Sequence, residues 1–198
     1  MDKYADDTYL IIPASNCQSC AVEFVHIENW AMENNLKLNR TKSVEIVFVL
    51  PRSRRATLIP PPAVSGVERV ELIQALGVTI NRKFSVAQRV DNLLAACAQT
   101  LFALRTLRRH GLPNDAIHSV FQAVVVAKLT YASPAWWGFS SAADRGRLEA
   151  FLRRAVIFNY RSDSVPSFLS LCEAADDKLF NSILYNTRHI LSPPPSFA

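Results

Sequence analysis

A run of apolar side chains between residues 86 and 104 constrains the fold of this chain more than any other sequence feature. These side chains recur at intervals of three and four residues, with one adjacent pair, so they share one face of a helix. The stripe consists of Val86, Val90, Leu93, Leu94, Cys97, Leu101 and Leu104. Basic residues follow it, and the helix is predicted to end near His110 and Gly111, because positive charge is favoured in a last helical turn.

The rest of the chain divides around this stripe. Three further helices are predicted after it, at about 113–131, 142–159 and 165–190, the last with a break or kink. Before it, short strands are predicted at 8–12, 44–50 and within 67–80, and one helix is predicted at about 20–34, with a stop at Asn34-Asn35. The patterns predict an α+β fold with a mixed domain at 1–81, a helical domain at 82–191 and a Pro-rich tail at 192–198.

Composition limits the class of protein. Hydrophobic residues make up 49% of the 198 residues, which excludes a disordered chain. The four cysteines indicate reduced thiols rather than a secreted disulfide scaffold. The first seven residues are rich in charge, and the uncharged stretches are too short to cross a bilayer. We therefore expect an intracellular protein, nuclear or cytoplasmic, without a signal peptide or a transmembrane segment.

Positive charge is concentrated in the helical half. Residues 81–161 contain 12 Lys and Arg against 4 Asp and Glu, whereas the whole chain has a net charge of only +5. Arg outnumbers Lys 16 to 6, and a planar guanidinium can bind two phosphate oxygens at once. This pattern favours a polyanionic partner, and nucleic acid in particular. The alternative is an ordinary solvated surface with ion pairs.

The sharpest local motif is Tyr4-Ala5-Asp6-Asp7, followed by an apolar β-type run. Two adjacent carboxylates repel each other, and a bridging divalent cation relieves that repulsion. Two such cations can support phosphoryl transfer, one activating the attacking oxygen and one stabilising the leaving oxygen. A solvated turn is the alternative interpretation of the same two residues.

Further motifs follow Tyr4-Ala5-Asp6-Asp7 along the chain. A predicted helix comes next, then Asn35-Leu36-Lys37-Leu38-Asn39, then Thr41-Lys42-Ser43 before a strand, and then Ala75-Leu76-Gly77-Val78. The order of these motifs resembles the reverse transcriptases of LINE-type non-LTR retrotransposons, including the jockey-like elements. The resemblance continues through the helices to Ala135-Trp136-Trp137-Gly138. It implies a partial polymerase palm, with short antiparallel strands and one helix, followed by an all-α thumb-like region. The implied activity is RNA-directed DNA synthesis by two-metal nucleotidyl transfer.

The resemblance also implies roles for individual residues. Asp6 and Asp7 correspond to catalytic ligands of two Mg²⁺ (or Mn²⁺) ions, and Lys42 corresponds to the residue that protonates the pyrophosphate. Leu76 and Gly77 correspond to the primer grip, and Tyr4 would lie close to the primer terminus. The implied partners are an RNA template, a DNA primer and dNTP. A plain surface Lys and a strand bulge at Gly77 are the simpler interpretations of Lys42 and of the Leu-Gly pair.

A thumb holds its duplex by the sugar-phosphate backbone, which requires positive charge rather than base recognition. The candidate contacts are Arg82, Lys83, Arg89, Arg105, Arg108 and Arg109, with a second group at Arg145, Arg147, Arg153 and Arg154. Trp136 and Trp137 could stack on bases, but packing between helices is the favoured interpretation. Cys17 and Cys20 are interpreted as a coincidental C-x-x-C, and Asp176-Asp177 is expected near a helix start.

Only Met1-Asp2-Lys3 precedes the motif, whereas the resemblance requires an earlier metal-binding Asp, the fingers and the first strand of the catalytic hairpin. We therefore expect the chain alone to be inactive as a polymerase. Two alternatives stay open beside an inactive fragment. One is a non-catalytic nucleic-acid-binding remnant that uses the Arg-rich helices, and the other is a partial or decayed copy without a selected function.

Overall fold

The computed structural model describes residues 2–4, 7–49, 60–162, 164–186, 189 and 191, with side chains from Thr8 onward. It is an α+β fold that is largely helical, which confirms the predicted class. The chain divides into two compact units, one of residues 1–73 and 81–83 and the other of residues 74–80 and 84–198. The tail predicted at 192–198 lies outside the described residues. None of the described helices has the length and apolar character needed to cross a membrane.

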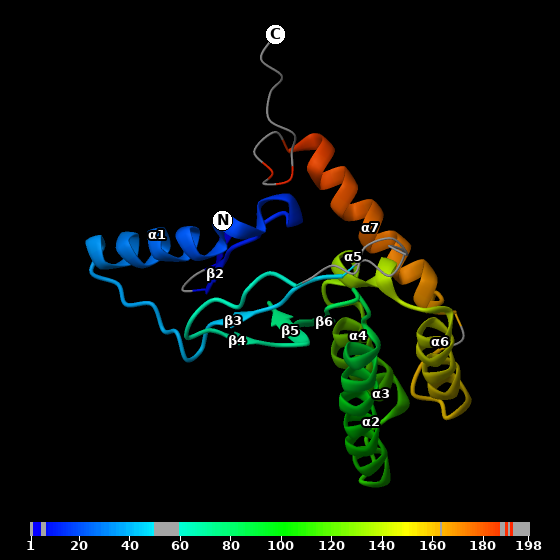
Figure 1. The fold of residues 1–198 in the computed structure, drawn as a ribbon. Helices are drawn as coiled ribbons and strands as arrows, with labels where there is room; N and C mark the ends of the chain where they lie inside the picture. Colours follow the sequence, from blue (N-terminus) through cyan, green and yellow to red (C-terminus); the bar gives the residue numbers. More distant parts are fainter. Residues whose placement is uncertain are drawn as a thin grey trace. The chain divides into compact units, whose positions relative to one another are not determined.

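The first unit contains a hairpin, a helix and a short pair of strands (Figure 1). Strands β1 (Asp2–Tyr4) and β2 (Asp7–Tyr9) are antiparallel, with Tyr4 opposite Asp7. The 3-10 helix η1 (Ala14–Ser19) leads into α1 (Cys20–Glu33). Helix α1 is followed by Asn35 at a φ of 55°, as predicted from the tolerance of Asn for the left-handed region. The hairpin corrects one expectation, because a first strand does precede the Asp-Asp pair.

Residues 44–49 of the strand predicted at 44–50 are described, and of these only Val44–Glu45 form a strand, β3. It pairs with β4 (Glu68–Arg69) in parallel rather than in the expected antiparallel arrangement. A strand needs a hydrogen-bonded neighbour along its length, and β4 offers only two residues. Arg69 reinforces the pair through hydrogen bonds of 3.0 and 3.1 Å to the Glu45 carboxylate.

The second unit is built on the predicted stripe. Strands β5 (Leu72–Ala75) and β6 (Val78–Asn81) form a hairpin, of which residues 74–80 belong to this unit, and α2 (Ala87–Arg109) follows. Val90, Leu93, Cys97 and Leu104 on α2 are buried, and Leu94 and Leu101 are partly buried against the same core. The predicted helix boundaries near residues 86 and 110 are confirmed.

The helix predicted at 113–131 contains a wider segment at its centre. It consists of α3 (Asn114–Val120), the π-helix η2 (Phe121–Val126) and α4 (Ala127–Thr130). Its buried residues Ile117, Phe121, Val125 and Leu129 are spaced by four, which drifts around an ordinary helix with 3.6 residues per turn. A π-helix has more residues per turn than an α-helix, so the π-segment offsets this drift and keeps the side chains on one face.

Shorter helices complete this unit. Helices α5 (Ser133–Trp136) and η3 (Trp137–Phe139) lead into α6 (Ala142–Ile157), which is followed by α7 (Phe168–Tyr185). The core joins Trp136, Trp137 and Phe168 to the buried faces of α2 and α6, so the two tryptophans pack between helices as predicted. Asp176 and Asp177 lie in the middle of α7, not near a helix start, and α7 is one unbroken helix of 18 residues.

Two cysteines of this core should make the free energy of unfolding depend on pH. Cys97 and Cys172 are fully buried, and burial raises the pKa of each thiol from 9.0 to about 11. Between pH 9 and 11 the unfolded thiols ionise while the folded ones keep their protons, so the free energy of unfolding should fall over this window. Urea unfolding across the window should show a smaller fall for a Cys97→Ala/Cys172→Ala variant. An equal fall in both proteins would contradict the burial of these thiols.

Candidate nucleic-acid interface

Of the candidate catalytic residues, Asp7 and Lys42 are described, and both belong to the first unit. The backbone of Asp7 begins β2, opposite Tyr4, while Asp6 and the side chain of Asp7 lie outside the described residues. Lys42 is exposed in a turn, where its backbone N–H donates to the carbonyl oxygen and Oδ1 of Asn39. Within the described part of the chain, no group of three or more His, Cys, Asp and Glu side chains could hold a metal ion.

The predicted primer-grip residues form the tight turn of the β5–β6 hairpin. Leu76 has a φ of 47° and Gly77 a φ of 80°, so both residues of this two-residue turn are left-handed. Such a turn matches the twist of the flanking strands, but the left-handed region is unfavourable for Leu. The hydroxyl of Tyr131 donates to the Leu76 carbonyl oxygen at 3.2 Å. The turn is therefore held by the helical part of the same unit.

Arg89 holds the other residue of the turn. Its Nη1 donates to the Gly77 carbonyl oxygen at 2.5 Å, and its Nη2 donates to the Tyr131 carbonyl oxygen at 3.2 Å. The guanidinium also lies 5.5 Å from the centre of the Trp136 ring. Arg89 is only 7% exposed, and this burial lowers its pKa. The structure thus uses Arg89 as an internal clamp, whereas the sequence made it a candidate for phosphate contact.

The other side chains predicted to contact phosphate differ in whether they already have partners within the protein. Arg82 pairs with Glu71 at 2.8 Å, while Lys83 is exposed. Arg105 and Arg109 are exposed near the end of α2. Arg108 donates to the carbonyl oxygens of Phe158 and Asn159 at 2.8 and 2.5 Å and lies over the Tyr160 ring. The structure therefore leaves Lys83, Arg105 and Arg109 exposed and engages Arg82 and Arg108 within the protein.

Helices α2 and α6 lie side by side and run in the same direction. Asp91 near the start of α2 contacts Arg147 near the start of α6, and Arg108 near the end of α2 contacts the residues after α6. A groove of about 540 Å³ opens along this pair. It is lined by Leu94, Arg147, Ala150, Arg153, Arg154 and Ile157. Its lining combines three apolar residues with three arginines, and all but Leu94 come from α6.

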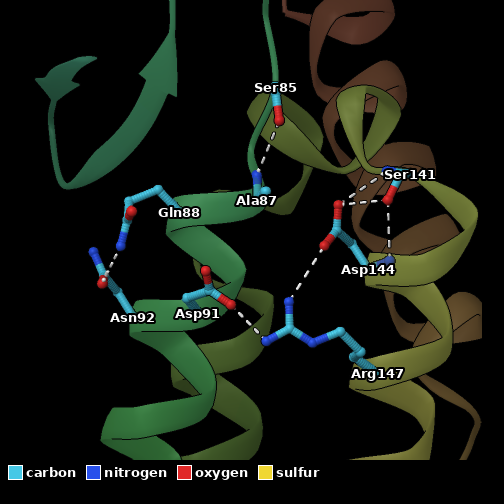
Figure 2. A network of polar contacts seen from close by, with 8 residues as sticks. All are labelled: Ser85, Ala87, Gln88, Asp91, Asn92, Ser141, Asp144 and Arg147. Carbon is cyan, nitrogen blue, oxygen red and sulfur yellow. Dashed lines mark hydrogen bonds and ion pairs between the residues drawn. The ribbon is translucent and has the colours of Figure 1, made fainter. Parts of the chain in front are cut away.

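Arg147 is the most constrained arginine of the groove (Figure 2). Its Nη2 lies 2.5 Å from Asp91 Oδ1, and its Nη1 lies 3.5 Å from Asp144 Oδ1. The hydrogen bond to Asp91 is the main cause that raises the pKa of Arg147. Asp144 is buried and accepts hydrogen bonds from the backbone N–H and the hydroxyl of Ser141, at the start of α6. Arg147 thus contacts one carboxylate on α2 and one on its own helix, α6.

Arg153 and Arg154 are the free charges of the groove. Both are exposed, and among the described residues neither takes part in an ion pair. Arg145 of the same helix turns elsewhere: its guanidinium lies 4.8 Å from the Trp137 ring centre, and its Nε donates to the Ser140 hydroxyl. A groove lined by two free guanidinium groups and by apolar side chains suits an extended anion with apolar surface between its charges.

Sequence reasoning named the arginines of α6 as a second group but did not identify the groove. Leu94 and Ile157 were missed as lining residues, and so was the pairing of Asp91 with Arg147. The only available signal was the arginine spacing along α6, because the partner residues lie 56 positions away in the sequence. Comparison of the chain with protein-family models, with curated proteins and with solved structures finds no match.

Proposed function

We propose that this chain is part of a LINE-type non-LTR reverse transcriptase and that its helical unit binds the sugar-phosphate backbone of a primer–template duplex. The observation that carries the proposal is the arginine-lined groove between α2 and α6. The order of the sequence motifs supports the family assignment. In the complete enzyme, we assign Asp6 and Asp7 to the catalytic Mg²⁺ ions, which would activate the attacking oxygen and stabilise the leaving oxygen.

The groove is suited to the backbone rather than to the bases. Arg153 and Arg154 are consecutive, so their side chains leave α6 about 100° apart and can reach different phosphates. Each guanidinium can donate two parallel hydrogen bonds to one phosphate. The apolar lining residues Leu94, Ala150 and Ile157 offer contact to sugars, and their side chains form no hydrogen bonds to base edges. Binding should therefore show little sequence preference and a strong dependence on salt.

Replacing the two free arginines tests this proposal. For an Arg153→Gln/Arg154→Gln variant of the full chain, we expect weaker binding to an RNA–DNA hybrid. The slope of log K against log salt should become shallower by about 1.8, because each lost phosphate contact removes about 0.9. Fluorescence anisotropy of a labelled hybrid across a NaCl series measures both quantities.

A matched control separates the groove from net charge. Lys128→Gln/Lys178→Gln also removes two positive charges, at exposed positions on α4 and α7 that do not line the groove. We expect this control to leave the salt slope nearly unchanged. Equal slopes for the two double variants would overturn the assignment of the groove, because binding would then depend on overall charge alone.

A further inference from the structure

The third arginine of the groove is already occupied by a carboxylate. Arg147 lines the groove together with Arg153 and Arg154, but its Nη2 faces Asp91 Oδ1 at 2.5 Å. A carboxylate in this position offers the guanidinium the same kind of acceptor oxygen as a phosphate does. Asp91 therefore contacts this guanidinium with an oxygen of the kind that a phosphate would also offer.

The two carboxylates around Arg147 are not equivalent. Asp144 is 6% exposed, and its Oδ2 accepts from the Ser141 hydroxyl at 2.6 Å and from the Ser141 backbone N–H at 3.3 Å. The Ser141 hydroxyl in turn accepts from the Asp144 backbone N–H, which completes a capping box at the start of α6. Asp144 thus uses Oδ2 to cap the start of α6, and it contacts Arg147 only through Oδ1, at 3.5 Å.

Asp91, in contrast, does not cap a helix. Its side chain is 50% exposed, and Arg147 is its one ion-pair partner among the described residues. The neighbouring polar pair, Gln88 and Asn92, is bonded to itself through Gln88 Nε2 and Asn92 Oδ1 (Figure 2). An exposed ion pair is weak and screened by salt, so a multivalent phosphate backbone can displace the carboxylate.

We propose that Asp91 is an internal competitor that withholds Arg147 from a bound phosphodiester backbone and so limits the affinity of the groove. This inference rests on the proposed function. When a phosphate displaces Asp91, Nη1 of Arg147 stays oriented by Asp144 while Nη2 turns to the ligand. The groove then presents Arg147, Arg153 and Arg154 along about 10 Å of α6, given a rise of 1.5 Å per residue.

A double-mutant cycle on the full chain tests the competition. For Asp91→Asn we expect hybrid binding about threefold to tenfold tighter at low salt, with a salt slope steeper by about 0.9, because one more arginine is free to contact phosphate. In an Arg147→Gln background, Asp91→Asn should have little effect. Asp177→Asn, which removes an exposed carboxylate from the middle of α7, is the charge-matched control and should change binding less than Asp91→Asn does.

The outcomes are distinct. If Asp91→Asn raised hybrid affinity equally in the native and Arg147→Gln backgrounds, the effect would come from the change in net charge. That result would overturn the proposed competition for Arg147. No tightening in the native background would also overturn it, provided that thermal unfolding shows the variant to be folded. If Arg153→Gln/Arg154→Gln weakens binding while Asp91→Asn changes nothing, the inference fails and the proposed function stands. If neither change has an effect, the proposed function itself fails.

Discussion

Arg89→Met is expected to lower the free energy of unfolding of the helical unit by about 3 kcal/mol, the sum of two hydrogen bonds from a charged donor at about 1.5 kcal/mol or more each. The variant keeps an apolar stem of similar length, so the loss reports the guanidinium. Without it, the carbonyl oxygens of Gly77 and Tyr131 lose the donors that now reach them at 2.5 and 3.2 Å. A loss of this size is a large part of the 5 to 15 kcal/mol that stabilises a typical domain.

Urea unfolding in a Trp30→Phe background measures this effect, because the remaining fluorescence comes from Trp136 and Trp137 of the helical unit. Arg109→Met is the matched control, since Arg109 is exposed at the end of the same helix and should cost less than about 0.5 kcal/mol. Arg89→Lys keeps the charge but has only one nitrogen, so it cannot reach both carbonyl oxygens and should recover little of the stability. Similar stabilities for Arg89→Met and Arg109→Met would contradict the buried clamp.

The same variant separates a clamp from a phosphate contact. If Arg89 only holds the Leu76–Gly77 turn, the folded Arg89→Met protein should bind the hybrid with an unchanged salt slope. A slope shallower by about 0.9 would instead return Arg89 to the set of phosphate contacts. The measurement therefore tests the one predicted contact that the structure moves from the surface into the core.

Arg89 shows why some site residues could not be assigned from sequence. Its place in α2 was predictable, since Val86, Val90 and Leu93 fix the phase of the helix. Its role was not, because its two acceptors lie 12 and 42 residues away, in a hairpin turn and in the turn after α4. An arginine beside an apolar stripe is normally a surface charge, and only tertiary structure shows which carbonyl groups it meets.

Helices and strands also differ in whether local sequence or a distant partner determines them. Helices α1, α2 and α6 were predictable because helical periodicity is contained within each segment. The strand predicted at 44–50 was wrong at the described residues 46–49, because strand formation depends on a partner that the segment itself does not specify. The π-segment of residues 121–126 was also missed, although the spacing of four between Phe121, Val125 and Leu129 was a readable signal.

Trp136→Ala is expected to lower the free energy of unfolding of the helical unit by about 3 to 5 kcal/mol, the usual cost of removing a buried aromatic side chain. Trp136 is fully buried. Its ring centre lies 6.4 Å from that of Phe168 and 6.3 Å from that of Trp137, so the change removes two aromatic contacts as well as the side-chain volume. Its Nε1 also donates to the Tyr131 carbonyl oxygen at 3.1 Å.

Because Arg89 and Trp136 share the Tyr131 carbonyl oxygen, their effects should not add. Trp136→Phe keeps most of the ring volume and loses the Nε1 donor, so combining it with Arg89→Met removes both donors from one acceptor. We expect the double variant to differ from the sum of the single losses by about 0.5 kcal/mol or more. Strict additivity would show that the two donors act independently.

Hybrid binding by Trp136→Ala tests the role of this side chain separately. If the variant left stability unchanged and weakened binding, Trp136 would be a base-stacking residue. The expected loss of stability instead places Trp136 at the centre of the core that holds the Leu76–Gly77 turn and the α2–α6 groove in one unit.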